Sequence, residues 1–141
     1  MIGRVLAVDP GEKRIGLAIS DQTGTIANPL KVIKHVSRTL DAAQIALEAG
    51  EQQARLIIVG QALDQEGLPG PRARSALRLA EAIRLQTDIP VDLWDESGST
   101  QAARAARLSM GVSRRKRSGH IDELAATIIL QSYLDAHAKQ S

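Results

Sequence analysis

The sequence contains no cysteine and no phenylalanine, and its aromatic side chains are one tryptophan and one tyrosine. Without cysteine, the chain has no disulfide scaffold, no thiolate zinc site and no cysteine nucleophile. With Trp94 and Tyr133 alone, it does not suit a protein that stacks single-stranded bases on several aromatic platforms. It also lacks a secretory signal and an apolar run of the roughly 18 residues that a membrane span requires. We therefore expect a cytoplasmic protein with no membrane attachment.

The 141 residues suit a single domain whose core is aliphatic. We expect this domain to cover residues 1–138, followed by a short tail at 139–141. The net charge of +2 is unevenly distributed, because residues 97–121 carry six basic side chains and no acidic one, whereas the rest carries 12 basic and 16 acidic residues. This distribution favours an anionic polymer as partner, although a solvated basic loop would give the same pattern.

Apolar runs and turn residues predict three consecutive strands, at Arg4–Val8, Arg14–Ser20 and Thr25–Ile33. The turn at Asp9–Lys13 makes the first two strands a hairpin, and Asn28-Pro29 makes the third an edge or bent strand. Three antiparallel strands in a row are the expected outcome.

The apolar period then changes to that of alternating helices and strands. In the first helix, Leu40, Ala43 and Leu47 share a face, and Gly50 ends the helix. The predicted elements are a helix at Ser37–Ala49, a strand at Arg55–Gly60, a helix from Pro71 to Thr87, a buried strand at Pro90–Trp94, a helix from Ser99 or Thr100 to Met110, a loop at Gly111–Gly119 and a helix from His120 or Ile121 to Ala138. This order predicts an α/β fold with a mixed central sheet, three antiparallel strands followed by parallel strands, and helices on both faces.

Carboxylates stand at the ends of three predicted elements. Asp9 closes the first strand, Asp95-Glu96 follows the last strand, and Asp122 opens the last helix. Each acid alone has an ordinary explanation, as a turn residue, a strand exit or a complement to the helix dipole. Asp122, however, heads the apolar stripe of Ala126, Ile129 and Tyr133, so it points toward the sheet, where a lone carboxylate is costly.

Together, these acids predict a site for hard divalent cations, Mg²⁺ or Mn²⁺, and two such ions can hydrolyse a phosphodiester. Asp95 is the reserve for Glu96, because neighbouring strand residues face opposite sides of a sheet. Lys13 and Arg14 follow the first acid and could contact a phosphate. The predicted loop carries four further cations that we expect to bind a nucleic-acid backbone: Arg114, Arg115, Lys116 and Arg117.

Several motifs resemble, in collinear order over about residues 3–136, those of the YqgF/RuvX family in the ribonuclease H-like superfamily. They are Val5–Gly16, Leu56–Gly60, Gly67–Arg74, Asp95-Glu96 with Ser99–Ala102, and Ile121-Asp122 with Ala125–Leu134. This chain departs from the family at Ser97-Gly98, where the family usually has Arg-Leu, so an arginine that could contact substrate is missing.

The resemblance implies a ribonuclease H-like, metal-dependent nuclease with Asp9, Glu96 and Asp122 as metal ligands and catalytic groups. It further implies a role in processing the 5′ end of pre-16S rRNA, with an RNA precursor favoured over a DNA junction as partner. The alternatives are a Holliday junction resolvase-like DNA endonuclease and a non-catalytic nucleic-acid-binding module. A two-domain sugar kinase or actin-like ATPase shares the opening hairpin but requires a longer chain. Because no apolar interface stripe is evident, we expect a monomer or a weak dimer.

Overall fold

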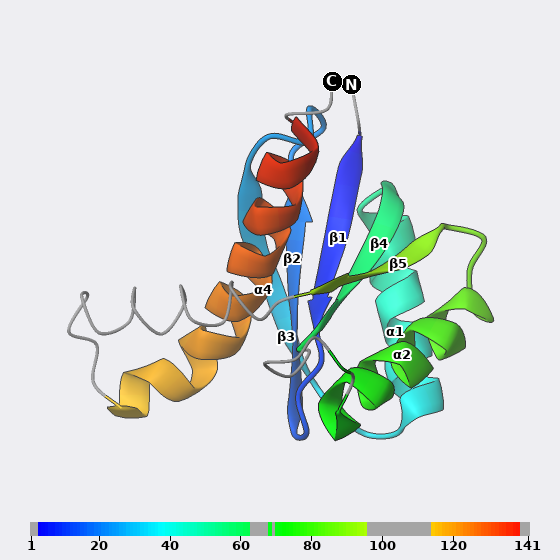
Figure 1. The fold of residues 1–141 in the computed structure, drawn as a ribbon, viewed down its shortest axis with the longest axis vertical. Helices are drawn as coiled ribbons and strands as arrows, with labels where there is room; N and C mark the ends of the chain where they lie inside the picture. Colours follow the sequence, from blue (N-terminus) through cyan, green and yellow to red (C-terminus); the bar gives the residue numbers. More distant parts are fainter. Residues whose placement is uncertain (1–2, 63–67, 69, 96–113, 139–141) are drawn as a thin grey trace.

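The computed structural model describes residues 3–62, 68, 70–95 and 114–138, which form one sheet flanked by helices (Figure 1). The elements are β1 (Arg4–Asp9), β2 (Arg14–Ser20), β3 (Ala27–Lys34), α1 (Arg38–Glu51), β4 (Ala54–Gln61), α2 (Pro71–Arg84), β5 (Val91–Asp95) and α4 (Arg114–Ala138). The predicted helix from Ser99 or Thr100 to Met110 lies outside the described residues.

The five strands lie in the order β3-β2-β1-β4-β5. β1 and β3 pair antiparallel with β2, whereas β4 pairs parallel with β1 and β5. The predicted mixed sheet is therefore confirmed, as is the edge position of β3 with its Pro29. The prediction of a buried strand at β5 is wrong, because β5 is the other edge and leaves Asp92 and Asp95 exposed.

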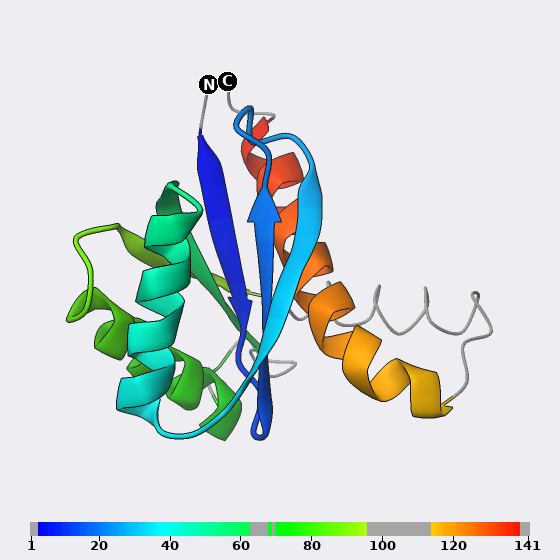
Figure 2. The same cartoon turned by 180° about the vertical axis from the view of Figure 1, so that it is seen from behind.

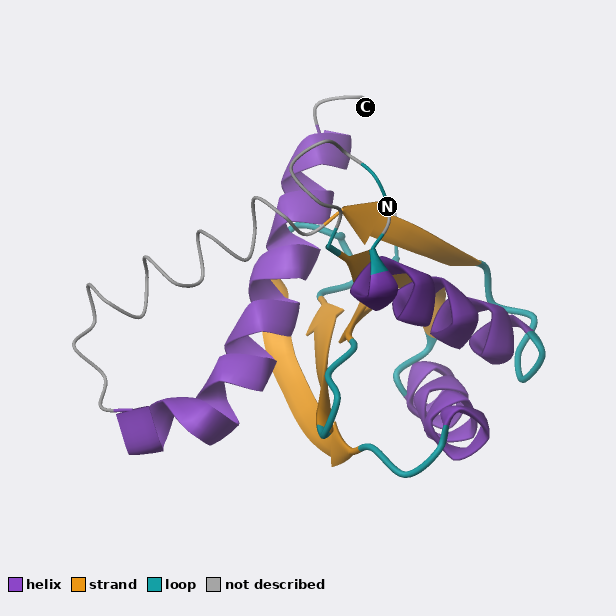
Figure 3. Cartoon of the chain, turned by 60° about the horizontal axis from the view of Figure 1, so that its bottom comes forward, coloured by secondary structure: helices purple, strands orange, loops and turns teal. Residues whose placement is uncertain are grey.

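Helices cover both faces of the sheet, as predicted (Figures 1, 2 and 3). α1 and α2 pack on one face, against Leu6 and Val8 of β1 among others. α4 packs on the opposite face, against Val5 and Ala7. This alternation along β1 gives two aliphatic cores, and it assigns a face to every residue of the strand.

The buried face of α1 differs from the predicted one. Leu40 and Leu47 are 58% and 61% exposed, whereas Ile45 and the acids Asp41 and Glu48 are buried. The acids are buried because each has a polar partner on β3 or just after it. Lys31 Nζ lies 2.5 Å from Glu48 Oε1, and this bond raises the pKa of Lys31, while Asp41 pairs with His35.

The helix ends also differ from the predictions. α1 continues through Gly50 and ends before Gln53, which adopts the left-handed conformation with φ 57°. α2 ends at Arg84 rather than Thr87, and its Leu77 is 39% exposed.

The segment predicted as a basic loop is part of α4, which begins at Arg114. The prediction of a loop at Gly111–Gly119 is therefore wrong over residues 114–119. Arg and Lys are good helix formers, and an interior glycine such as Gly119 costs a helix only about 1 kcal/mol.

Small side chains bring α4 close to the sheet. Ala126 of α4 and Ala7 and Ala18 of the strands are all fully buried in the same core. The side chain of Gln131 bridges the helix to the β2–β3 connection: it accepts from the Ala27 N–H at 3.0 Å and donates to the Thr25 carbonyl at 3.0 Å. No helix within the described part of the chain is long and apolar enough to cross a membrane.

Candidate active site

Asp9 is the last residue of β1, at the edge of the sheet where the parallel strands end. It follows Val5 and Ala7 in the alternation, and these two residues pack against α4. The side chain of Asp9 therefore belongs to the α4 face of the sheet. The residue is half-buried.

Two buried glycines flank Asp9 on the neighbouring strands. The register pairs Asp9 with Gly16 of β2, and the pairing of Val8 with Val59 places Gly60 of β4 on the other side. Both glycines fall on the α4 face, because their alternation partners Ala18 and Ile58 pack there. The strands beside Asp9 thus present no side chain, which leaves room for groups that bind its carboxylate.

Asp95 is the last residue of β5. Asp95 follows Val91 and Leu93, which pack on the α1 and α2 face, so it lies on the opposite face from Asp9. This placement disfavours Asp95 as the reserve metal ligand. Glu96, the preferred candidate, lies outside the described residues.

Asp122 lies within α4, one helical turn before the buried Ala126. α4 runs in the opposite direction to β1, so its earlier turns lie toward the end of the sheet where β1 finishes (Figures 1 and 2). One turn back along α4 covers about 5–6 Å, close to the distance from Ala7 to Asp9 along β1. The backbone thus places Asp122 toward the level of Asp9, although its side chain is not described.

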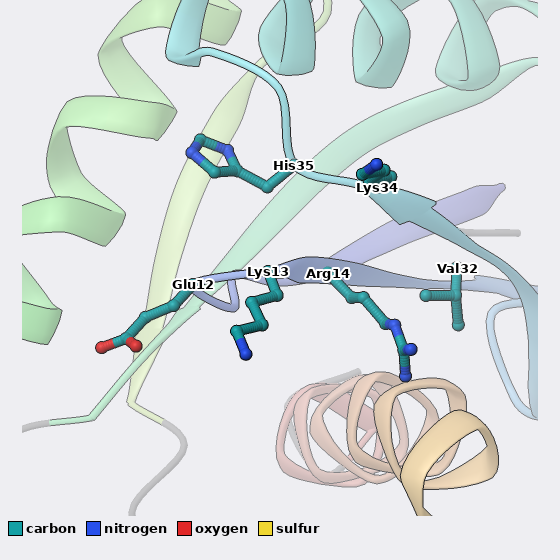
Figure 4. A pocket seen from close by; sticks show the side chains of 6 residues that line it. All are labelled: Glu12, Lys13, Arg14, Val32, Lys34 and His35. Carbon is teal, nitrogen blue, oxygen red and sulfur yellow. The ribbon is translucent and has the colours of Figure 1, made fainter.

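The predicted cations occupy two elements. Lys13 and Arg14 are exposed at the β1–β2 hairpin, next to the end of β1 that carries Asp9, and both point to the side of α4 (Figure 4). Arg114, Arg115, Lys116 and Arg117 form the first turn of α4. Both groups lie toward the same end of the sheet (Figure 1).

An aromatic cluster lies where β5 meets α4. Trp94 packs edge-on against Tyr133 at 5.2 Å between ring centroids, and Tyr133 stacks on His137 at 3.9 Å. The indole N–H of Trp94 donates to Ser132 Oγ at 3.3 Å. Burial, and to a lesser extent Asp92, raises the pKa of Tyr133. Tyr133 is on the packed face of α4 as predicted, and these contacts also hold the end of β5 against α4.

The part of the site that the structure describes fits a hard divalent cation. Asp9 offers carboxylate oxygens, and the positions beside it on both neighbouring strands are glycines. Among the described residues, no group of three or more acidic, histidine or cysteine side chains is close enough to hold a metal; of the three predicted ligands, Glu96 lies outside those residues and Asp122 is described by its backbone alone. Sequence analysis missed the contribution of Gly16, which lies inside β2, and of Gly60, which directly follows the apolar run of β4.

The architecture is an α/β fold that resembles those of two Holliday junction resolvases. It superposes on Thermus thermophilus RuvC bound to a Holliday junction substrate with a TM-score of 0.59 at 18% identity, covering 99% of this chain and 98% of that one. The fowlpox virus Holliday junction resolvase gives a TM-score of 0.54 at 13% identity, covering 94% of this chain and 99% of that one. These similarities concern the fold.

Sequence similarity extends over nearly the whole chain. The family model described as "RuvX: Holliday junction resolvase" matches residues 3–136. A Clostridioides difficile protein named "Putative pre-16S rRNA nuclease" is 40% identical over 133 residues, covering 94% of each chain. A Brucella canis protein of the same name is 42% identical over 132 residues, covering 93% of this chain and 81% of that protein. This chain belongs to the RuvX family, and it is a nuclease, a hydrolase of phosphodiester bonds.

Proposed function

We propose that this nuclease is metal-dependent, acts in the cytoplasm and processes the 5′ end of pre-16S rRNA. The observation that carries the proposal is the position of Asp9, half-buried on the α4 face and flanked by Gly16 and Gly60. The names of the full-length relatives support rRNA as the substrate.

In this proposal, Asp9, Glu96 and Asp122 hold Mg²⁺ or Mn²⁺, in a two-ion arrangement. Bound there, the metal supplies an activated water and neutralises charge on the leaving oxygen. The chain's own residues have separate roles. Asp9 fixes its carboxylate at the end of a rigid strand, and the glycines beside it admit the sugar–phosphate backbone. Lys13 and Arg14 contact the phosphates and orient the strand that is cut.

Matched substrates test the choice of nucleic acid. The purified protein is incubated with Mn²⁺ and a pre-16S 5′-leader RNA, single-stranded DNA of the same sequence, or a four-way DNA junction. We expect cleavage of the RNA near the mature 5′ end, with slower or no cleavage of the junction. A resolvase needs two coupled sites and thus a dimer. A stable dimer in solution, together with symmetric paired nicks on the junction at rates above those on RNA, would overturn the proposal in favour of a DNA resolvase.

The cations in the first turn of α4 give a further prediction. Changing Arg114, Arg115, Lys116 and Arg117 together to Ala should weaken binding of all RNA sequences alike and flatten its dependence on salt, because backbone contacts read no sequence. Alanine also favours a helix, so α4 should be retained in circular dichroism. Equal affinity and an equal salt slope for the wild type and this variant would show that the cations serve only solubility.

A further inference from the structure

A groove of about 600 Å³ opens between the β1–β2 hairpin and the end of β3 (Figure 4). Its volume lies within the range of ligand sites in proteins. Three of the lining side chains are cations and one is a carboxylate, which gives the groove a charge of +2 before His35 is counted. The lining residues are Glu12, Lys13, Arg14, Val32, Lys34 and His35.

Backbone contacts join the two walls of this groove. The N–H of His35 donates to the Lys13 carbonyl at 2.9 Å and so continues the β2–β3 ladder beyond its last strand pair. On the hairpin side, a Cβ at Gly11 would lie 2.1 Å from the Arg14 carbonyl oxygen, so the tight turn requires glycine. These contacts fix the backbone positions of the hairpin and of the end of β3 relative to one another.

The far wall is held by a buried carboxylate. Asp41, which is 3% exposed, pairs with the His35 ring and accepts from the Val36 N–H at 3.0 Å. The following residue, Ser37, caps α1 by accepting from the Leu40 N–H at 3.2 Å. These bonds fix the β3–α1 junction and with it the position of Lys34.

The strand register sets the distance from the groove to Asp9. Asp9 pairs with Gly16, and Arg14, two residues further along β2, pairs with Lys34 of β3. Two strand spacings across the sheet and two residues along it separate the Cα atoms of Asp9 and Lys34 by about 12 Å. A Lys side chain can cover half of this distance, so Lys34 can contact the same nucleic-acid strand as Asp9.

We propose that this groove binds a backbone phosphate of the nucleic acid that flanks the bond cut at Asp9, with Lys34 and Lys13 as its ligands. The inference rests on the proposed nuclease site, and it adds Lys34 and the wall at His35 to the residues found from the sequence. Such contacts set the position of the strand and carry no sequence information. The groove should therefore bind RNA and single-stranded DNA with the same ligands.

Binding of a short fluorescein-labelled single-stranded RNA, measured by anisotropy without divalent metal, tests the groove apart from cleavage. Loss of one phosphate contact lowers the salt slope for a single strand by about 0.7, which corresponds to about five-fold weaker binding near 0.1 M salt. We expect this change for Lys34→Ala, twice the change in slope for the Lys13→Ala, Lys34→Ala double variant, and equal losses with DNA of the same sequence.

Arg78→Ala is the matched control, because it removes one exposed cation from the middle of α2, on the other face of the sheet. It should bind as the wild type does, and all variants should melt within a few degrees of one another. Wild-type affinity and salt slope for Lys34→Ala, or a loss of affinity equal to that of Arg78→Ala, would contradict the proposed phosphate site in the groove. If Lys34→Ala weakens binding but the wild type cuts no nucleic acid, the groove stands and the proposed nuclease site fails.

Discussion

Asp9→Asn will reduce Mn²⁺-dependent cleavage by at least about a thousand-fold, equivalent to about 4 kcal/mol of transition-state stabilisation. The substitution keeps the shape of the side chain but removes the charge that binds a hard cation. Asp9 has no substitute, because both neighbouring strands present glycine on the same face. We expect Glu96→Gln and Asp122→Asn to have effects of the same size. The rates are measured under single-turnover conditions on the RNA that the wild type cuts.

Asp95→Asn provides the control for Asp9→Asn. Asp95 also ends a strand, but it lies on the opposite face of the sheet, so its loss should leave the cleavage rate within a few-fold of the wild type. Without metal, Asp9→Asn should melt at the same temperature as the wild type or higher, because clustered carboxylates repel one another. Wild-type cleavage by Asp9→Asn would show that the metal site is assigned wrongly.

Ala126→Leu will lower both stability and activity. The Ala126 side chain is fully buried between α4 and the sheet, where Ala7 and Ala18 leave no space for a larger residue. Overpacking there should cost about 1–3 kcal/mol, or about 4–12 °C in melting temperature. It should also displace the preceding turn that carries Asp122, and an error of about 1 Å at a catalytic group can cost on the order of a hundred-fold in rate.

Ser75→Leu is the control for added volume, because Ser75 is a small residue exposed on α2. It should change the melting temperature by no more than a few degrees and leave the cleavage rate unchanged. Ala126→Ser tests whether added volume causes the loss of activity in Ala126→Leu. Serine is nearly isosteric with alanine, so this variant should keep most of the activity. Full activity of Ala126→Leu would mean that the packing of α4 against the sheet does not position the catalytic residues.

Much of the fold follows from the sequence, because apolar runs and turn residues are local signals. β2 begins and ends at the predicted residues, and the edge position of β3 follows from Pro29. The face of α1 could not be predicted in this way. Asp41 and Glu48 are buried because they bind partners on or after β3. A sequence pattern that assumes acids face solvent therefore predicts the wrong buried face, the one that carries Leu40 and Leu47.

Part of the candidate site could likewise be predicted from the local sequence, and the rest depends on contacts made in the folded structure. Asp9 was found because it ends a strand that is recognisable in isolation. The face on which Asp95 lies, the glycines beside Asp9 and the groove at Lys34 all depend on strand register, which joins residues distant in sequence. The loop predicted for the four cations at the start of α4 is wrong, because Arg and Lys have high helix propensity.

The aromatic cluster contains an intrinsic fluorescent probe of the contact between β5 and α4. Trp94 is the single tryptophan, and its indole touches Tyr133 and His137 of α4 while its N–H bonds to Ser132. Its fluorescence therefore comes from the one junction where the edge strand leading to Glu96 meets the helix carrying Asp122. Emission from this indole follows the docking of α4 on β5 without a dye or an added label, and it distinguishes a displaced helix from an unfolded chain.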